Sequence, residues 1–208
     1  MKITTLWEIA EQPIHYLKAL EAMESYVDDI INNTAPNKIW LLEHFDVYTG
    51  GSSSSPEDII APKGIEIINT NRGGKFTYHG IGQRIIYPMI NLNEFRDIKL
   101  YIASLENWII STLQDFNLDA FKKDGMIGIW VLDSGVEKKI GAIGVRVKKW
   151  VAYHGIAINI NPDIAKFSGI VPCGISNFGV TSLQKLKKDV SFKNFDISLK
   201  NNFNKVFN

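Results

Sequence analysis

The sequence predicts one α/β (α+β) domain in which short strands and hairpins alternate with two amphipathic helices. The chain has 208 residues, 45% of them hydrophobic, which is enough for a large core and fits one domain better than two. Apolar residues recur at helical spacing in segments 14–32 and 98–116, and short apolar runs that end near glycines lie between and after them. We therefore expect a single domain over residues 1–208.

The first half of the chain predicts a helix followed by short strands. From Tyr16 to Ile30, apolar side chains stand three and four positions apart with charged residues between them, as on a surface helix. Apolar runs at 39–42 and 65–69 suit buried strands. The serine-rich stretch 50–62 between these runs predicts a mobile surface loop or lid.

Residues 72–83, RGGKFTYHGIGQ, bring glycines together with Arg72 and His79. The GIGQ portion lacks the third glycine that would open a helix, so dinucleotide binding is not expected. We expect a hairpin whose glycines leave one wall of a pocket open for an extended ligand. Arg72 would clamp an anionic group or pair with a carboxylate, and its type does not decide between the two.

The second half predicts a scaffold helix at 98–116, a strand near 128–131, and a hairpin formed by 139–147 and 150–160. Lys139 heads the first hairpin strand, which is lined with glycine and alanine. A lysine at the start of a strand usually reaches solvent. The tail, residues 185–208, has a few large apolar residues among many Asn and Lys, and predicts a weakly packed C-terminal element.

Cys173 is the only cysteine, and it stands between Pro172 and Gly174. Proline fixes its own φ and glycine tolerates positive φ, so this stretch predicts a turn that presents a thiol. A lone cysteine is also often a small buried hydrophobe, and both interpretations stay open at this point. One cysteine excludes an internal disulfide framework.

The charge balance excludes some partners. The chain has 23 Lys and Arg against 22 Asp and Glu, a net charge of +1, which provides no overall attraction to nucleic acid or to an anionic membrane. Charged residues interrupt the N-terminal stretch, and no apolar run reaches the 18 or more residues of a membrane span. We expect a soluble, cytoplasmic protein.

Four segments together resemble the lipoyl(octanoyl) transferases, also called the lipoate-protein ligase B family: RGGKFTYHGIGQ, KIGAIGVRV, YHGIAINI and PCGISNFGVTSL, in this order. The resemblance covers residues 40–183. It implies a mixed, largely antiparallel sheet flanked by helices, like the catalytic domains of biotin and lipoate ligases. It also implies a monomer that needs no cofactor and no metal and that binds neither nucleic acid nor a membrane. Its donor would be octanoyl-acyl carrier protein, and its acceptors would be lysines on the lipoyl domains of 2-oxoacid dehydrogenases and on the glycine cleavage H protein.

The resemblance implies roles for individual residues. Cys173 matches the nucleophile that accepts the acyl group, and Lys139 matches the lysine that lowers the pKa of this thiol. An unperturbed thiol with a pKa of about 8.5 is only a few per cent thiolate at pH 7, so a nearby ammonium speeds attack. Lys75 and Ile81 depart from the family pattern, in which glutamine and proline are common. The residues expected to bind the acyl substrate are Arg72, Gly73, Gly74, Lys75, Phe76, Thr77, Tyr78, His79, Ala142, Ile143, Gly144, His154, Gly155, Ile156 and Ala157.

Several alternatives remain open from the sequence. His79 and His154 rival Lys139 as the base, since histidine is the commonest general base. The backbone N–H of Gly174 is a candidate oxyanion donor. The chain could instead be an ATP-dependent lipoate or biotin ligase, although such enzymes need no cysteine nucleophile. A silent module that binds lipoyl domains or acyl carriers and a thiol hydrolase are the other candidates.

Overall fold

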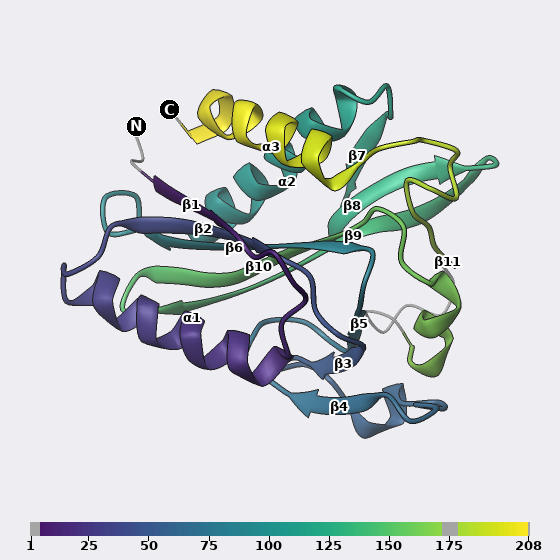
Figure 1. Cartoon of the computed structure of the whole chain (residues 1–208), viewed down its shortest axis with the longest axis horizontal. Coiled ribbons are helices and arrows are strands. Elements are labelled where there is room, and N and C mark those ends of the chain that lie inside the picture. Colours follow the sequence, from purple (N-terminus) through teal and green to yellow (C-terminus); the bar gives the residue numbers. More distant parts are fainter. Residues whose placement is uncertain (1–4, 172–178, 208) are drawn as a thin grey trace.

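The computed structural model describes residues 5–171 and 179–207, which form a large and a small sheet with three α-helices (Figure 1). Among these residues the neighbouring strands of the large sheet pair antiparallel, except for the parallel pairs β1–β2 and β9–β11. The last strand, β11 (Gly179–Val180), pairs with β9 beyond the point where β10 ends. The order along the main path of the sheet is β1 (Thr5–Ile9), β2 (Asn37–Leu42), β6 (Gln83–Asn91), β10 (Val151–Asn159), β9 (Val136–Lys148), β8 (Met126–Asp133) and β7 (Ala120–Lys123).

The small sheet stands at one end of the large one. Its strands are β4 (Glu66–Asn69), β3 (Val47–Gly50) and β5 (Thr77–His79), in that order. Two 3₁₀ turns, η1 (Pro56–Asp58) and η2 (Ile164–Gly169), accompany it. Its own apolar cluster contains Tyr48, Phe76, Tyr78, Phe167 and Ile170.

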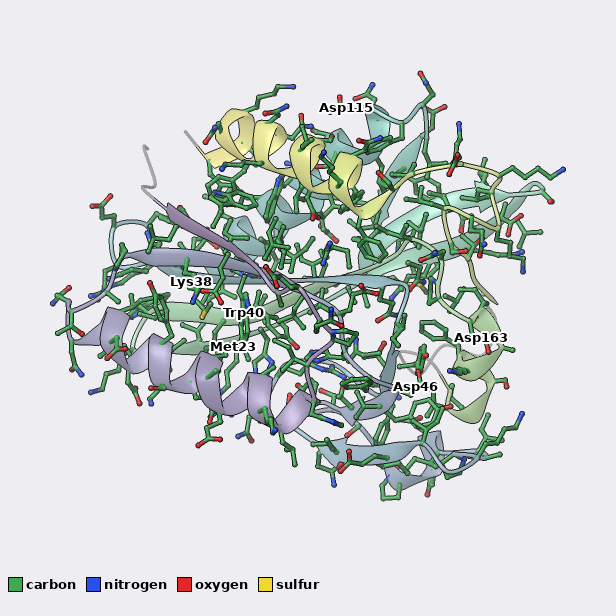
Figure 2. The ribbon with its side chains drawn as sticks, in the orientation of Figure 1. Met23, Lys38, Trp40, Asp46, Asp115 and Asp163 are labelled. Carbon is green, nitrogen blue, oxygen red and sulfur yellow. The ribbon has the colours of Figure 1, made fainter. Side chains whose placement is uncertain are left out.

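The helices cover both faces of the large sheet. Helix α1 (Tyr16–Ile31) lies on one face, where Met23 packs in a cluster with Trp40 of β2 (Figures 1 and 2). Helices α2 (Ile98–Gln114) and α3 (Phe192–Phe207) lie on the other face. In the described part of the chain, none of the helices is both long and apolar enough to cross a membrane.

These elements confirm the predicted fold class, both predicted helices and the hairpin of β9 and β10. The prediction of a weakly packed C-terminal element at 185–208 was wrong. Phe195, Leu199 and Phe203 of α3 are almost fully buried, and the indole N–H of Trp108 donates to Leu199 O at 2.8 Å. Their four-residue spacing places them on one helix face, which packs on α2 and outweighs the polar composition of the segment.

The prediction of a hairpin at 72–83 was also wrong. Strand β5 pairs with β3 in the small sheet, whereas β6 pairs with β2 and β10 in the large one. A turn closed by a hydrogen bond from Gln83 N–H to Gly80 O carries the chain from one sheet to the other. The serine-rich stretch is attached to the same region, because Ser52 N–H donates to Arg72 O and Ser53 N–H donates to Gly74 O. Backbone hydrogen bonds therefore connect part of the predicted mobile loop or lid to the glycine-rich segment.

Candidate active site

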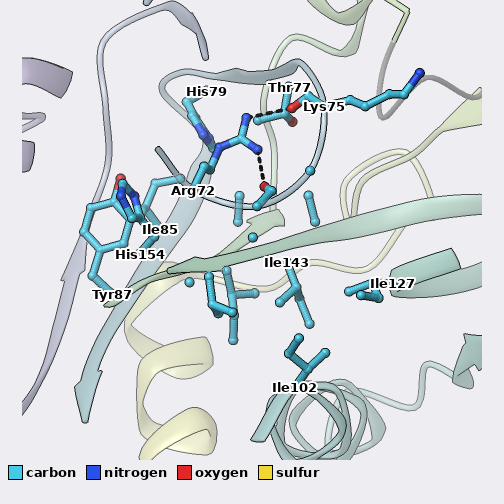
Figure 3. Close-up of a pocket in the computed structure, with 18 of the residues that line it drawn as sticks. Arg72, Lys75, Thr77, His79, Ile85, Tyr87, Ile102, Ile127, Ile143 and His154 are labelled. Carbon is cyan, nitrogen blue, oxygen red and sulfur yellow. Dashed lines mark hydrogen bonds between the residues drawn. The ribbon is translucent and has the colours of Figure 1, made fainter. Parts of the chain in front are cut away.

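A cavity of about 410 Å³ lies where the glycine-rich segment meets β9 and β10 (Figure 3). Its size falls within the ordinary range for small-ligand sites. Figure 3 shows β9 passing between two groups of lining residues, one near Arg72 and the other near Ile102 of α2. The predicted site residues that line it are Arg72, Gly73, Gly74, Lys75, Thr77, His79, Lys139, Ala142, Ile143, Gly144, His154, Gly155, Ile156 and Ala157.

Phe76 and Tyr78 are not on the cavity wall, although the sequence placed them with the acyl-binding residues. Both rings are buried in the apolar cluster of the small sheet, and Tyr78 packs edge to face with Phe167. Alternate side chains of a strand point to opposite faces, so Thr77 and His79 line the cavity while their neighbours do not.

Arg72 shapes the wall through hydrogen bonds to the chain around it. Its guanidinium donates from Nη2 to Thr49 O at 2.6 Å, to Thr49 Oγ1 at 2.9 Å and to Lys75 O at 3.0 Å. Nη1 donates to Gly73 O at 2.9 Å. These bonds fold segment 72–75 around the guanidinium, which neither sequence interpretation of Arg72 anticipated. The Lys75 side chain extends away from the cavity and lies 3.9 Å from an Asp58 oxygen (Figure 3).

The small residues of β9 let this segment sit directly on the strand. Gly73 N–H donates to Val145 O at 3.0 Å. A Cβ atom on Gly144 would lie 3.0 Å from Gly73 O, which is closer than nearly all real contacts of this kind. Glycine at position 144 therefore serves the close approach of two backbones, and it does not simply widen the cavity for a ligand as the sequence suggested.

Lys139 is buried in the wall, with only 9% of its surface exposed. Its ammonium donates to Ile127 O at 3.1 Å and lies 4.8 Å from the centre of the Trp130 ring. Gly128, at φ +136°, makes room for it, since a Cβ there would lie 3.2 Å from Lys139 Nζ. Lys139 is thus not the solvated lysine that usually begins a strand.

The two cavity histidines are buried and neutral near pH 7. Burial is the main cause that lowers the pKa of His154 to about 3, and the charges of Arg72 and Arg146 lower it further. Burial also holds the pKa of His79 well below its ordinary value, with help from His44 and Arg72. His154 has a left-handed backbone, with φ of +58°, which is uncommon outside glycine.

Aromatic residues from distant elements complete this end of the cavity, and the sequence did not single them out. Tyr16 of α1 and Tyr87 of β6 both line it. The Tyr87 hydroxyl lies 2.7 Å from His44 Nε2, and His44 Nδ1 lies 2.8 Å from Ile14 O. Because a carbonyl only accepts, His44 carries its hydrogen on Nδ1 and Tyr87 donates to Nε2. A tyrosine on the apolar face of a predicted helix was the only available signal for Tyr16.

The apolar end of the cavity comes partly from the helix that the sequence assigned to scaffold. Ile98 and Ile102 of α2 line it, with Met126 and Ile127 at the start of β8. Ile143 lies between them and the glycine-rich segment (Figure 3). The cavity therefore has aromatic and polar groups at one end and branched apolar side chains at the other.

Cys173 lies outside the described residues, and its role stays a prediction. Described residues before and after it make backbone contacts with η1 and β9. Val171 N–H donates to Asp58 O at 2.7 Å. Val180 pairs with Lys139 in the parallel ladder between β11 and β9.

Comparisons with known proteins identify the family of the chain. A model of the lipoyl protein ligase A/B catalytic domain family matches residues 15–204. The octanoyltransferase of Ehrlichia chaffeensis is 44% identical over 203 residues, which cover 97% of this chain and 95% of that protein. The octanoyltransferase of Wolbachia pipientis wMel is 48% identical over 205 residues, which cover 98% of this chain and 100% of that protein.

Solved structures of lipoate protein ligases share the fold. The structure of the bipartite lipoate protein ligase from Thermoplasma acidophilum matches with a TM-score of 0.75, covering 99% of this chain and 84% of that chain, at 16% identity. A likeness at that identity concerns the fold alone, whereas the two relatives above share the sequence along nearly its whole length. The chain therefore belongs to the octanoyltransferases of the lipoyl protein ligase A/B catalytic domain family, which are acyltransferases.

Proposed function

We propose that the protein moves an octanoyl group from octanoyl-acyl carrier protein to a lysine of a lipoyl domain, through a thioester on Cys173. In the first step the Cys173 thiolate attacks the donor's thioester carbonyl, the bond to the carrier sulfur breaks, and the leaving carrier thiolate takes up a proton from the Lys139 ammonium. In the second step the lysine amine of the lipoyl domain attacks the acyl-cysteine, gives a proton back to Lys139, and releases the Cys173 thiolate. Neither step needs ATP.

The observation that carries the proposal is the place of Lys139. It is a buried ammonium on the wall of a cavity, and it pairs with the chain seven residues after Cys173. An ammonium at contact range favours a thiolate over a thiol, and lowering the thiol pKa from about 8.5 to about 7 raises the thiolate fraction at pH 7 more than tenfold.

The apolar end of the cavity supports a medium-length acyl chain as substrate. Ile98, Ile102, Ile127 and Ile143 line that end of the cavity. Burying about six methylenes of an octanoyl chain contributes roughly 5 kcal/mol, at about 0.8 kcal/mol each. This contribution grows with every methylene up to the length that the cavity holds, so the cavity sets a preferred chain length.

The histidines are less suitable bases than Lys139. A proton acceptor works best when its pKa is near the working pH, whereas burial lowers the pKa of His154 to about 3 and that of His79 well below its ordinary value. We assign the proton of the incoming amine to Lys139, which is neutral at that stage because it has given its own proton to the leaving carrier. The rings of His79 and His154 act as neutral hydrogen-bonding groups.

The acceptors that we propose are the lipoyl domains of 2-oxoacid dehydrogenases and the glycine cleavage H protein. Lipoate protein ligases share the fold, and the Thermoplasma acidophilum ligase belongs to a lipoylation system with an E2 lipoyl domain. The monomeric state and the cytoplasmic location stay predictions. Size-exclusion chromatography with light scattering tests the first of them.

One incubation tests the proposed chemistry. Purified protein is mixed with octanoyl-acyl carrier protein without ATP and then read by intact mass. The wild type should gain one octanoyl mass that hydroxylamine removes, and a lipoyl domain added afterwards should take up that mass as a hydroxylamine-stable amide. Cys173→Ala should gain nothing. An unchanged adduct on Cys173→Ala would refute the acyl-cysteine, free octanoate without an acceptor would indicate a hydrolase, and binding without any adduct would indicate a silent module.

A further inference from the structure

A buried chain of side-chain hydrogen bonds joins the cavity to Thr181, the residue that directly follows strand β11. His79 Nδ1 lies 3.1 Å from Gln83 Oε1, and Gln83 Nε2 donates to Asn159 Oδ1 at 2.9 Å. Asn159 Nδ2 donates to Thr181 O at 2.9 Å. Gln83, Asn159 and Thr181 are each at most 4% exposed, so solvent does not replace any of these bonds.

Two backbone carbonyls fix the direction of the whole chain of bonds. Thr181 O only accepts, so the amide of Asn159 turns its NH₂ toward Thr181 and its oxygen toward Gln83. Tyr78 O also only accepts, and it takes the second hydrogen of Gln83 Nε2 at 3.1 Å. Gln83 therefore presents Oε1 to His79, and the reverse orientation of either amide would set donor against donor or acceptor against acceptor.

This direction sets the tautomer of His79. Since Gln83 Oε1 accepts, His79 Nδ1 carries the hydrogen, and Nε2 of the neutral ring is left with its lone pair. An imidazole in this state accepts hydrogen bonds at Nε2 and does not donate there. On the wall of an acyl-transfer cavity, such an acceptor can receive a hydrogen bond from an incoming amine, whereas it has no hydrogen to donate to a carbonyl oxygen.

The other end of the chain of bonds holds β11 against Lys139. Thr181 N–H donates to Lys139 O at 3.0 Å, and Thr181 Oγ1 donates to Asp133 Oδ2 at 2.9 Å. Lys138 Nζ lies 2.9 Å from the same Asp133 oxygen. Asn159 thus stands between a cavity histidine and the strand that pairs with the cavity lysine.

We propose that Gln83, Asn159 and Thr181 are positioning residues for the transfer reaction. At one end they hold His79 with its lone pair on Nε2, and at the other they keep β11 in register with Lys139. The inference rests on the proposed function, because both ends matter only if the cavity carries out acyl transfer. A satisfied buried network adds little to stability over well-packed apolar groups, so its value here lies in the orientation that it imposes.

Asn159→Ala tests this role, and Asn202→Ala is its matched control. Asn202 is also about 1% exposed and donates through Nδ2 to Asp115 and Ser198 O, but it belongs to α3 and does not line the cavity. Both variants should lose thermal stability to a similar degree. Only Asn159→Ala should slow octanoyl transfer to a lipoyl domain, by about tenfold or more since small misplacements have effects of this size. Its KM for the octanoyl donor should stay within about twofold.

Nitrogen-15 NMR of the His79 ring provides a readout that loss of stability alone does not move. The wild type and Asn202→Ala should show hydrogen on Nδ1 and none on Nε2, and Asn159→Ala should show a mixture of both tautomers. His79→Gln assigns the signals. If Asn159→Ala does not fold, Gln83→Met breaks the same chain of bonds next to His79 and should give the same mixture.

The outcomes separate this inference from the proposed function. A wild type with hydrogen on Nε2, or an Asn159→Ala variant as active as Asn202→Ala, would overturn the positioning role. Loss of the acyl adduct in Cys173→Ala and slow transfer in Lys139→Met would still support the chemistry in that case. If those two variants behave like the wild type, the proposed function fails. The tautomer measurement still decides the direction of the chain of hydrogen bonds.

Discussion

Replacing Lys139 with methionine should raise the pKa of Cys173. Methionine keeps most of the bulk of the buried side chain and removes the ammonium that donates to Ile127 O beside the Trp130 ring. With a separation of about 5 Å and an effective dielectric constant of about 20, a charge pair is worth about 3 kcal/mol, or roughly two pKa units. Solvent at the cavity mouth reduces this, so we expect the pKa to rise by one to two units.

Alkylation by iodoacetamide measures the change directly, because the chain has a single cysteine. The rate followed against pH reports the thiolate fraction, and its inflection should move upward in Lys139→Met. The adjacent Lys138 provides a matched control, since its ammonium is already paired with Asp133 at 2.9 Å. Lys138→Met, His79→Gln and His154→Gln should move the inflection much less.

A particular pattern would refute this assignment. If Lys139→Met leaves the inflection unchanged while His79→Gln or His154→Gln moves it by a unit, a histidine promotes the thiolate. The role of Lys139 that the family resemblance implies, lowering the pKa of Cys173, would then be wrong. An acyl-cysteine intermediate would still be possible. Equal shifts in Lys138→Met and Lys139→Met would indicate a diffuse effect of net charge, and the proposed contact would again be wrong.

Three further predictions concern the cavity, the surface and the core. Ala142→Leu adds three carbons to the cavity wall and should shift the preference toward shorter acyl chains, by up to about 50-fold for three displaced methylenes. Competition between octanoyl and shorter thioesters measures this shift. An unchanged preference would place the bound acyl chain elsewhere. We expect an acidic carrier to dock on a basic surface cluster that includes Arg146 and Lys149. Its affinity should weaken as salt rises from about 50 to 500 mM, and it should weaken less when both of these residues are replaced by alanine. An affinity independent of salt would contradict this. Burial raises the pKa of Asp196 to about 6 against the opposing charge of Arg84. The folded state therefore binds more protons than the unfolded state between pH 4 and 6. The free energy of unfolding should fall by up to about 3 kcal/mol as pH rises through that window. Asp196→Asn should flatten that part of a denaturation series, and an unchanged slope would assign it to other groups.

Local periodicity made parts of the fold predictable. Helix α1 was expected at 14–32 and extends over Tyr16–Ile31, because a 3.6-residue pattern reports one buried face without knowledge of its partner. The hairpin of β9 and β10 was equally local, since its strands are joined by a short turn. In α3 the same kind of signal was present in Phe195, Leu199 and Phe203, but the Asn and Lys between them concealed it.

Pairing between distant segments could not be predicted in the same way. The partner of β5 is β3, some thirty residues earlier, and nothing in segment 72–83 distinguishes this pairing from a hairpin with β6. Phe76 and Tyr78 lie off the cavity wall for a simpler reason, because a motif carried over as a block ignores the alternation of side chains along a strand, and their role in substrate binding stays a prediction. The motifs located Lys139 and His154 on the cavity wall, whereas Tyr16, Tyr87 and Ile102 come from elements that only the fold brings there.

The charges of the cavity explain why one lysine should dominate its chemistry. Burial lowers the pKa of His79 and His154 and raises that of Tyr87, so these groups are neutral at pH 7. Arg72 directs its guanidinium to the carbonyls of segment 72–75 and to Thr49, and Lys75 extends away toward Asp58. Lys139 instead contacts one carbonyl and one aromatic face, neither of which carries a formal charge. We therefore expect Lys139 to stabilise a negative charge that forms beside it, whether a thiolate or a tetrahedral intermediate, and the charge at this position should matter more to the rate than its bulk.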